Sequence, residues 1–245
     1  MAIKTTLNYS PNFDLKKRRP SKIKFIILHY TGMKNESNAI RKLTNINSKV
    51  SCHYFIKNNG EIVTMVPDLY VAWHAGKSSW KNYISLNKNS IGIEISNPGH
   101  NFYYRKFSKN QIISLVKLNK LLIKKYKINL KNVLGHSDIA PERKKDPGEK
   151  FPWKFFSKKK ICFWHNLNQI ELRKTRGHKI SAIEEKMFIK NLFKIGYSKK
   201  ATKNFNFNKQ IYYKIITKAF QRRFRQELVN GKIDKECFII SKNLI

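Results

Sequence analysis

The sequence predicts a mixed α/β domain, in which helices flank a central β-sheet, followed by a small C-terminal domain of three helices. Three observations predict this class. The apolar run of residues 22–30 is nearly continuous, as in a buried strand. Residues 108–125 keep helical spacing behind a capping box, and beyond Phe156 only helical patterns follow. With 245 residues, 41% of them hydrophobic, the chain is long enough for one good-sized core and a small second domain.

Strands and helices alternate in the first part of the chain. Residues 37–46 place apolar side chains on one helical side, and the turn Asn59-Gly60 between two β-like runs indicates a hairpin. Ser108 and Gln111 make a capping box at the start of an amphipathic helix. The predicted elements are, in order, a strand at 22–30, a helix at 37–46, strands at 53–56, 62–66 and 90–96, a helix from 108 to about 125, and an extended piece around 133–134.

The pattern changes after His136. Residues 137–152 show little apolar periodicity and contain three prolines, which predicts an irregular loop. Long ordered loops in compact domains are often functional, so this loop is a candidate location for chemistry.

Helical spacing dominates the C-terminal part. The predicted elements are a helix that opens at a capping box of Ser181 and Glu184 and ends near Gly196, a helix at 210–225, a turn at 230–231, and a short helix after Asp234. Together they predict a compact three-helix unit.

The formal net charge is +36, from 51 Lys and Arg residues against 15 Asp and Glu residues. Such a charge attracts polyanions through a field that weakens with salt. The basic residues are spread along the whole chain, however, and form no recognised nucleic-acid-binding element. The abundance of Lys, Asn and Ile is also what the codon bias of an AT-rich genome produces. A solvated basic surface is therefore favoured over nucleic acid as the primary partner.

The cysteines and the N-terminal residues bear on the compartment. Cys52, Cys162 and Cys237 are an odd number, widely separated, which favours reduced structural cysteines over a disulfide framework. Residues 1–20 are polar and lack the apolar core of a secretory signal, and no later apolar run is long enough to span a bilayer. We expect a cytoplasmic protein, with export to the periplasm by an unusual route left open.

The residues that carry candidate chemistry are His29, Glu94, His136, Lys144 and Asp146. Each alone has an ordinary explanation, because a lone histidine is more often a core or surface residue and an aspartate before proline is ordinarily a turn residue. Together, two imidazoles and one carboxylate can hold zinc tetrahedrally and leave the fourth position to water. Such a site suits hydrolysis of an amide when a nearby base takes the proton of the water. Glu94 is the candidate base, and a structural salt bridge is the alternative, because a buried carboxylate needs a partner.

Several segments resemble the type 2 N-acetylmuramoyl-L-alanine amidases, a family that includes the AmpD and AmiD enzymes and is related to peptidoglycan recognition proteins. The segments are IILHYT at 26–31, SCHYFI at 51–56, AWHAG at 72–76, SIGIEI at 90–95, GHSDIAP at 135–141 and RKKDPG at 143–148. The resemblance covers roughly residues 22–156, and residues 135–148 carry its most specific part.

The resemblance implies one zinc ion per chain, in a cleft at the strand ends. It implies that His29, His136 and Asp146 are the zinc ligands, that Glu94 activates a zinc-bound water, and that Lys144 stabilises the oxyanion. An ammonium group aimed at a developing negative charge in a water-excluded site is physically suited to that role. An ordinary solvated lysine is the alternative for Lys144.

The resemblance also implies substrate contacts. His74 would contact the sugar or the stem peptide, Trp73 would support the cleft wall, and Asn97 lies where AmiD-like members carry a polar contact. The alternatives are plain core packing for Trp73 and turn chemistry for Asn97, which precedes a Pro-Gly pair. His53 is better explained as a satisfied core histidine.

The C-terminal unit resembles the three-helix peptidoglycan-binding domain of AmiD-like enzymes, through AFQRRFR at 219–225 and NGKID at 230–234. A structural helical cap or a dimerisation element, and hence a homodimer, are the alternatives. The expected division is an N-terminal extension at 1–21, a zinc amidase domain at 22–160, a linker at 161–180 and a helical peptidoglycan-binding-like domain at 181–245.

The expected function is zinc-dependent hydrolysis of the amide bond between N-acetylmuramic acid, including its 1,6-anhydro form, and the L-alanine of peptidoglycan stem peptides. Cell-wall recycling and remodelling both remain open as its setting. The alternatives are a noncatalytic peptidoglycan-binding or muropeptide-binding protein and a nucleic-acid binder. All the ligand positions that the resemblance implies are filled, which argues against the noncatalytic alternative.

Overall fold

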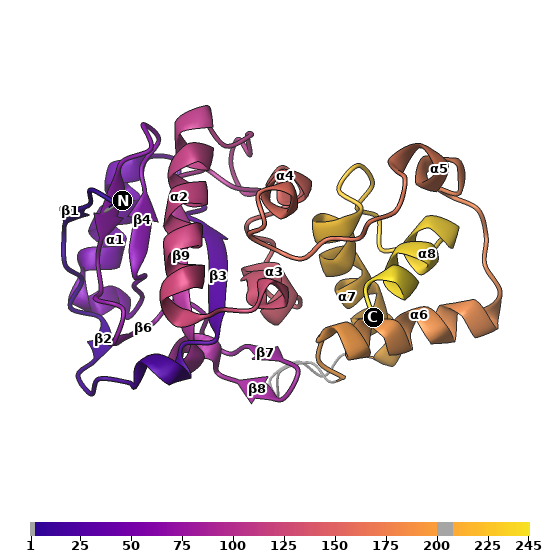
Figure 1. Cartoon of the computed structure of the whole chain (residues 1–245), viewed down its shortest axis with the longest axis horizontal. Coiled ribbons are helices and arrows are strands. Elements are labelled where there is room, and N and C mark those ends of the chain that lie inside the picture. Colours follow the sequence, from indigo (N-terminus) through magenta and orange to yellow (C-terminus); the bar gives the residue numbers. More distant parts are fainter. Residues whose placement is uncertain (1–2, 200–207) are drawn as a thin grey trace.

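The computed structural model describes residues 3–199 and 208–245. An α/β part and a helical C-terminal part lie side by side (Figure 1). In the described part of the chain, no helix is long and apolar enough to cross a membrane.

The centre of the α/β part is a six-stranded sheet in the order β1-β5-β4-β9-β3-β10. Its antiparallel pair is β4 with β5, whose ladder runs around the predicted Asn59-Gly60 turn, and the other neighbours are parallel. The strands are β1 (Thr6–Leu7), β5 (Ile62–Thr64), β4 (Tyr54–Ile56), β9 (Ser90–Ile95), β3 (Phe25–Tyr30) and β10 (Val133–Gly135).

Two small sheets and several helices surround this sheet. Strands β2 (Phe13–Asp14) and β6 (Val71–Ala72) pair with each other, as do β7 (Ser79–Trp80) and β8 (Tyr83–Ile84). The helices of this part are α1 (Glu36–Thr44), α2 (Lys109–Tyr126), α3 (His136–Ile139) and α4 (Trp153–Lys158), with 3-10 turns η1 (Pro20–Lys22), η2 (Ile46–Ser48), η3 (Leu86–Asn89) and η4 (Leu130–Asn132).

The C-terminal part contains α5 (Gln169–Lys174), α6 (Ala182–Ile195), α7 (Lys209–Phe224) and α8 (Lys235–Asn243). Ser181 caps α6 through the predicted capping box, and Asp234 caps α8. Gly231 adopts a φ of 78° at the turn between α7 and α8, a backbone conformation that glycine reaches without steric cost.

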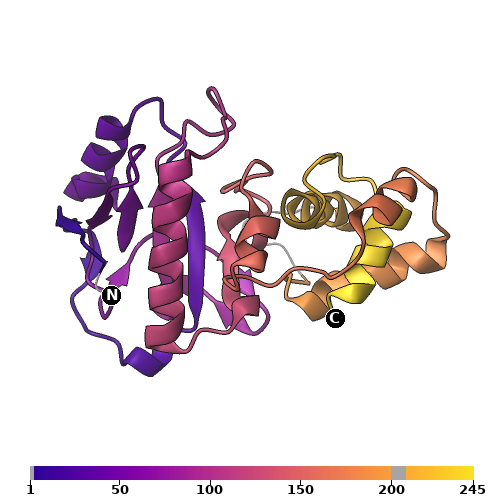
Figure 2. The same cartoon turned by 45° about the horizontal axis from the view of Figure 1, so that its top comes forward.

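The alternation of side chains along the strands separates two faces of the sheet. On β9, Ile91, Ile93 and Ile95 point to the face that α2 covers and form one hydrophobic core with it. The other residues of β9, Ser90, Gly92 and Glu94, therefore lie on the opposite face. Figures 1 and 2 show α2 lying along the sheet. Because β9 carries small and polar residues on its second face, it leaves room for a polar site there.

A second core joins the two parts of the chain. Phe25 and Ile27 of β3 pack in one buried cluster with Phe188 of α6 and Phe220 of α7. Arg223 of α7 also forms a buried ion pair with Asp138 of α3, with 2.7 Å between Nη1 and Oδ2. The C-terminal helices therefore pack directly against the α/β part.

Most of the predicted elements are confirmed. The strands at 22–30 and 90–96, the hairpin, the helices at 37–46 and 108–125 and the three C-terminal helices all form, with ends within three residues of the predicted ones. The prediction for residues 137–152 is wrong at its start, because α3 continues to Ile139 before the irregular loop begins. The short strands β1 and β2 lie within the predicted N-terminal extension, and the division into domains stays a prediction.

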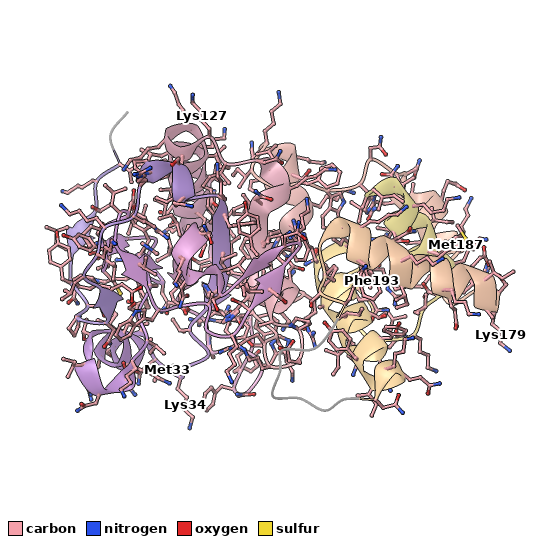
Figure 3. All side chains as sticks on the ribbon, turned by 90° about the horizontal axis from the view of Figure 1, so that it is seen from below. Met33, Lys34, Lys127, Lys179, Met187 and Phe193 are labelled. Carbon is pink, nitrogen blue, oxygen red and sulfur yellow. The ribbon has the colours of Figure 1, made fainter. Side chains whose placement is uncertain are left out.

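The basic residues are distributed over the whole surface. Lys34, Lys127 and Lys179 are exposed at edges of the molecule that lie far apart (Figure 3). The cysteines Cys52, Cys162 and Cys237 are buried and form no disulfide.

Candidate active site

Two neighbouring parallel strands bring the candidate histidines together. His29 lies near the carboxyl end of β3, and His136 follows β10 directly. Gly135 pairs with Leu28 in the ladder, so the next residues along the two strands, His136 and His29, emerge at the same edge of the sheet. Ligand sites of open α/β sheets characteristically lie at the carboxyl ends of the strands.

Asp146 completes the group from the loop after α3. The amide of Ser137 donates to the carbonyl of Asp146 at 2.8 Å, which folds the loop back onto the start of the helix. Asp146 Oδ2 then lies 3.0 Å from His29 Nδ1 and 3.1 Å from His136 Nδ1, and the two nitrogens are 2.9 Å apart. All three side chains are buried.

This geometry fits a zinc ion. Ligands at the usual 2.0–2.1 Å from a tetrahedral zinc lie about 3.3 Å from one another. The three converging atoms of His29, His136 and Asp146 lie within 3.1 Å of one another, close to that spacing. Two imidazoles and one carboxylate are also a donor set that leaves one position of a catalytic zinc for water.

The three groups shift one another's pKa. Burial and, after it, the charge of the neighbouring His136 lower the pKa of His29 to about 4, against the opposing hydrogen bond to Asp146. Burial likewise lowers the pKa of His136. Although burial alone would raise the pKa of Asp146, the charge and hydrogen bonds of the two histidines hold it well below its usual range. The group therefore favours neutral imidazoles and an ionised carboxylate, the protonation states that bind a metal.

Glu94 lies beside this group. It is paired with His29 in the ladder of β9 and β3, so both side chains rise from the same face of the sheet. One carboxylate oxygen, Oε2, is enclosed and has no hydrogen-bond partner among the described residues. Burial, reinforced by the negative charge of Asp146, raises the pKa of Glu94 well above its usual value. A carboxyl group in this state is suited to exchanging protons near neutral pH.

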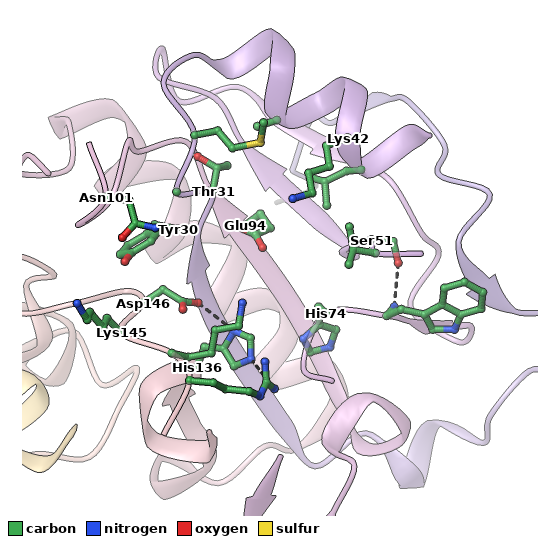
Figure 4. Close-up of a pocket in the computed structure, with 18 residues that line it drawn as sticks. Tyr30, Thr31, Lys42, Ser51, His74, Glu94, Asn101, His136, Lys145 and Asp146 are labelled. Atoms are coloured by element: carbon green, nitrogen blue, oxygen red, sulfur yellow. Dashed lines mark hydrogen bonds and ion pairs between the residues drawn. The ribbon is translucent and has the colours of Figure 1, made fainter. Parts of the chain in front are cut away.

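A cavity of about 420 Å³ opens above these residues. Glu94, His74, His136 and Asp146 all line it (Figure 4). Its remaining charged residues are basic and come from α1 and from the loop after α3: Lys42, Arg143, Lys144 and Lys145. A molecule bound in the cavity would therefore be surrounded by positively charged side chains.

The candidate oxyanion residue Lys144 lies on this wall. It is half-buried, and its backbone amide donates to the carbonyl of Ala140 at 3.0 Å. In the part of the chain that the structure describes, no hydrogen bond or ion pair holds its ammonium group, so that group is available to a ligand.

Of the predicted substrate contacts, Trp73 and His74 line the cavity, whereas Asn97 does not. Trp73 lines the cavity and donates from its indole nitrogen to Asp14 Oδ1 at 2.7 Å. His74 also lines the cavity, but both of its ring nitrogens have partners within the protein. Asn97 is buried and not part of the lining, and its side chain bonds to the carbonyl of Arg105 and the amide of Gly99. The substrate-contact roles stay predictions.

His53 is fully buried, as expected for a core histidine. Its Nδ1 accepts from the amide of Gly92 at 3.0 Å, and its Nε2 lies 3.1 Å from the carbonyl of Tyr70.

Sequence reasoning missed Lys42 and Arg143. Arg143 donates to the carbonyls of Ala75 and Lys77 and so ties the loop after α3 to the 73–77 segment. Its place inside the RKKDPG segment is a signal that could have pointed to it. Lys42 reaches the cavity from α1, far away in the sequence, and no local pattern marks it.

Comparison with known proteins gives consistent results. Residues 19–149 match the sequence model of the family described as N-acetylmuramoyl-L-alanine amidase. The N-acetylmuramoyl-L-alanine amidase AmiD of Escherichia coli is 32% identical over 236 residues, which cover 91% of this chain and 83% of AmiD. The 1,6-anhydro-N-acetylmuramyl-L-alanine amidase AmpD of Citrobacter freundii is 41% identical over 108 residues, covering 44% of this chain and 56% of AmpD.

Solved structures show the same fold over nearly the whole chain. The complex of E. coli AmiD with anhydro-N-acetylmuramic acid-L-Ala-D-gamma-Glu-L-Lys superposes with a TM-score of 0.80 at 32% identity, covering 91% of this chain and 88% of AmiD. AmpDh3 of Pseudomonas aeruginosa in complex with anhydromuramic pentapeptide gives a TM-score of 0.77 at 27% identity, covering 94% and 92% of the two chains.

Proposed function

The chain belongs to the N-acetylmuramoyl-L-alanine amidase family, and from this premise we propose that it hydrolyses, with one bound zinc ion, the amide bond between N-acetylmuramic acid and the first L-alanine of peptidoglycan stem peptides. The observation that carries the proposal is the convergence of His29, His136 and Asp146 within 3.1 Å, with Glu94 on the adjacent strand.

His29, His136 and Asp146 would hold the metal. Zinc bound there would supply Lewis-acid chemistry, which would make water a stronger nucleophile near neutral pH and polarise the scissile carbonyl.

Glu94 is proposed as the proton carrier of the reaction. Its enclosed oxygen has no protein partner, so it can accept the proton that the attacking water loses. The raised pKa lets the same group hold the proton and then donate it to the departing amine of L-alanine. One residue thus serves as base and as acid, and no covalent bond to the protein is needed.

Lys144 is proposed to stabilise the oxyanion. The ammonium group stands on the cavity wall without a competing internal partner, whereas the neighbouring Arg143 is already bonded to backbone carbonyls. A positive charge close to the oxygen of the scissile carbonyl stabilises the negative charge of the tetrahedral state more than it stabilises the planar amide.

The basic residues around the cavity and the ligands of the relatives support the proposed substrate class. Stem peptides carry carboxylates, which the lysine-lined walls attract. Both superposed relatives are complexes with anhydro-muramyl peptides. We propose anhydro-muropeptides as substrates, with some activity on polymeric peptidoglycan, and Trp73 as part of the wall that the substrate packs against. Action in the cytoplasm and a homodimer stay predictions.

The C-terminal helices are proposed to engage the polymer. A groove of about 1050 Å³ between α6 and α7 has the apolar side chains Ile189, Phe193 and Tyr213 in its lining, together with several lysines. Aromatic and apolar surface framed by hydrogen-bond donors is suited to a glycan chain.

The first test incubates the purified protein separately with 1,6-anhydro-muropeptide and with intact sacculi, and detects products by mass spectrometry. We expect free stem peptide, its loss when a chelator removes zinc, and its loss in Glu94→Gln, which keeps the shape of the side chain without its charge. Lys154→Met, an exposed lysine of α4, serves as the control.

Two other outcomes would contradict the proposed zinc amidase function. Cleavage that survives chelation overturns the role of zinc. Sedimentation of the zinc-loaded protein with sacculi without release of peptide would identify a noncatalytic peptidoglycan-binding protein instead.

A further inference from the structure

One short segment lies behind both histidine ligands. His74 Nδ1 is 3.0 Å from His29 Nε2, and the carbonyl oxygen of Ala75 is 3.1 Å from His136 Nε2. In both histidines Nδ1 faces the proposed metal position, and Nε2 faces this segment. Adjacent residues of the AWHAG segment therefore contact the outer nitrogens of both ligands.

The partner of His136 decides where its proton lies. A carbonyl oxygen can only accept, so the 3.1 Å contact with Ala75 places the hydrogen of His136 on Nε2; Arg143 Nη2 lies farther from this nitrogen, at 3.4 Å, and itself donates to the same carbonyl. A neutral imidazole has one hydrogen, and His136 Nδ1 is consequently left with a free lone pair directed at Asp146 and the proposed metal position.

A longer chain of hydrogen bonds fixes the position of the hydrogen on His29. Ser90 Oγ donates its single hydrogen to the carbonyl of Leu86 at 2.7 Å. The hydroxyl can then only accept from His74 Nε2, which lies 3.1 Å away. His74 Nδ1 is therefore an acceptor and takes the hydrogen of His29 Nε2, which leaves the lone pair of His29 Nδ1 free.

The segment that makes these bonds is itself fixed. Asn87 Oδ1 accepts from the backbone amides of His74, at 3.1 Å, and Ala75, at 2.7 Å. Gly92 of β9 makes room for the imidazole, because a Cβ at this position would lie 2.3 Å from Cγ of His74. The position of His74 is thus fixed by the hydrogen bond of its backbone amide, by the packing of its ring on Gly92 and by the contacts of both ring nitrogens.

We propose that His74 is a positioning residue, which together with Ser90 and the Leu86 carbonyl fixes the metal-binding tautomer and the ring orientation of His29, while the Ala75 carbonyl does the same for His136. The inference rests on the zinc site of the proposed function. It gives His74 a role other than substrate contact, since neither ring nitrogen is left for a substrate. Such outer partners typically contribute about 10- to 100-fold to metal affinity.

The wild-type protein provides the first test. Nitrogen-15 NMR of the histidine side chains in the zinc-loaded protein should show His74 as the neutral form with its hydrogen on Nε2. A coupling across the hydrogen bond should connect His29 Nε2 with His74 Nδ1. Finding the hydrogen of His74 on Nδ1, or finding no connection to His29, overturns the proposal without any substitution.

Variants provide the second test, with zinc affinity measured by competition against a chromophoric chelator. His74→Asn keeps an acceptor near the position of Nδ1, whereas His74→Leu has a similar size and no acceptor. We expect His74→Leu and Ser90→Ala to lower the zinc affinity by about 10- to 100-fold, and His74→Asn to retain most of it. Ser241→Ala removes an equally buried serine hydroxyl in α8 and should change nothing.

Equal affinities for the Asn and Leu variants, or a wild-type affinity for Ser90→Ala, would refute the positioning role. Far-ultraviolet circular dichroism of the metal-free variants shows which of them fold, and if His74→Leu does not, Ser90→Ala and the NMR spectra decide. If the wild-type protein itself binds no zinc, the proposed function fails, and that result is distinguishable from failure of the present inference.

Discussion

The carboxylate of Glu94 illustrates how the site depends on the neighbours of single residues. It stands on a strand between Ile93 and Ile95, which are buried in the core on the other face of the sheet. The ladder places it level with His29, and no described group hydrogen-bonds its enclosed oxygen. Burial destabilises the charged form of such a carboxylate unless a bound molecule provides a hydrogen bond or an opposite charge. The structural salt bridge considered from the sequence does not form in the described part of the chain.

Lys144 gives a prediction at the same scale. Lys144→Met keeps the length of the side chain and removes the charge that would stabilise the oxyanion. Because that interaction develops only in the transition state, we expect kcat to fall by about 100-fold, with KM changed little. Steady-state kinetics on anhydro-muropeptide measure both constants, with Lys154→Met as the control on an exposed helix face. A rise in KM at unchanged kcat would instead assign Lys144 to substrate binding.

The clustering of the proposed ligands His29, His136 and Asp146 could be predicted from the sequence, but the contacts behind them could not. His29, His136 and Asp146 stand in segments whose order and spacing are specific. The role inferred for His74 depends on which nitrogen faces which atom, and its partner Ser90 comes from a strand 16 residues further on. No local pattern encodes that contact, so the resemblance implies a substrate contact for His74 instead.

At the scale of elements, the long periodic segments were predictable and the short ones were not. Helix α2, with its capping box, and α6 follow the pattern closely. Strands β2, β7 and β8 have two residues each and cannot show a periodicity. Helix α3 has four residues, and the sequence predicts a loop for three of them, 137–139. Its position depends on contacts that are distant in the sequence.

The most consequential of these contacts joins α3 to α7. Asp138 Oδ2 accepts from Arg223 Nη1 and from the backbone amide of Gly135, and its other oxygen accepts from Tyr197 at 2.8 Å. Both charged partners are buried, with 4% and 1% of their side chains exposed. Since Asp138 lies two residues after His136, the C-terminal helices help to place this proposed metal ligand.

Breaking this pair should therefore affect stability and metal binding together. Arg223→Met leaves the charge of Asp138 buried and unpaired, which should lower the free energy of unfolding by about 3–5 kcal/mol. Arg173→Met removes an exposed partner of Glu227 and should cost less than about 1 kcal/mol. Urea denaturation compares the two variants, and chelator competition measures the zinc affinity. Equal stability of the two variants would show that the α3–α7 pair contributes no more than a surface contact.

At the scale of the whole molecule, the two parts share one core. Residues of β3 and β10 pack in the same buried cluster as residues of α6, α7 and α8. The change of pattern after Phe156 predicts the second set of helices, but it does not indicate that their apolar side chains share a buried cluster with β3 and β10. Docking of elements is decided by shape and apolar area, which the periodicity of one element does not specify. We therefore expect the two parts to unfold in a coupled manner.

The buried histidines of both parts predict how this shared stability varies with pH. Burial, with the charge of Arg18 adding to it, lowers the pKa of His53 in the α/β part to about 3. Burial, followed by the charge of Lys154, lowers the pKa of His165 beside the C-terminal helices to about 4. In the unfolded chain both histidines take up a proton near the ordinary pKa of about 6.5. As the pH falls from about 6.5 to 4, the unfolded state gains protons that the folded state does not, and the free energy of unfolding decreases.

Urea denaturation of the metal-free protein at a series of pH values measures this dependence. We expect a nearly constant free energy of unfolding between pH 7 and 8 and a loss on the order of a few kcal/mol by pH 4.5. His165→Gln removes one of the titrating groups, so its loss over the same range should be smaller than that of the wild type. His165 makes one long contact to Gln169, leaves Nδ1 without a partner among the described residues and stacks its ring on Trp164, so the variant is compared with the wild type by the change of its stability with pH and not by its absolute stability. A wild-type stability that stays flat from pH 7 to 4.5 would mean that both imidazoles are protonated in the folded chain. Burial would then not lower the pKa of His53 or of His165 in the folded protein.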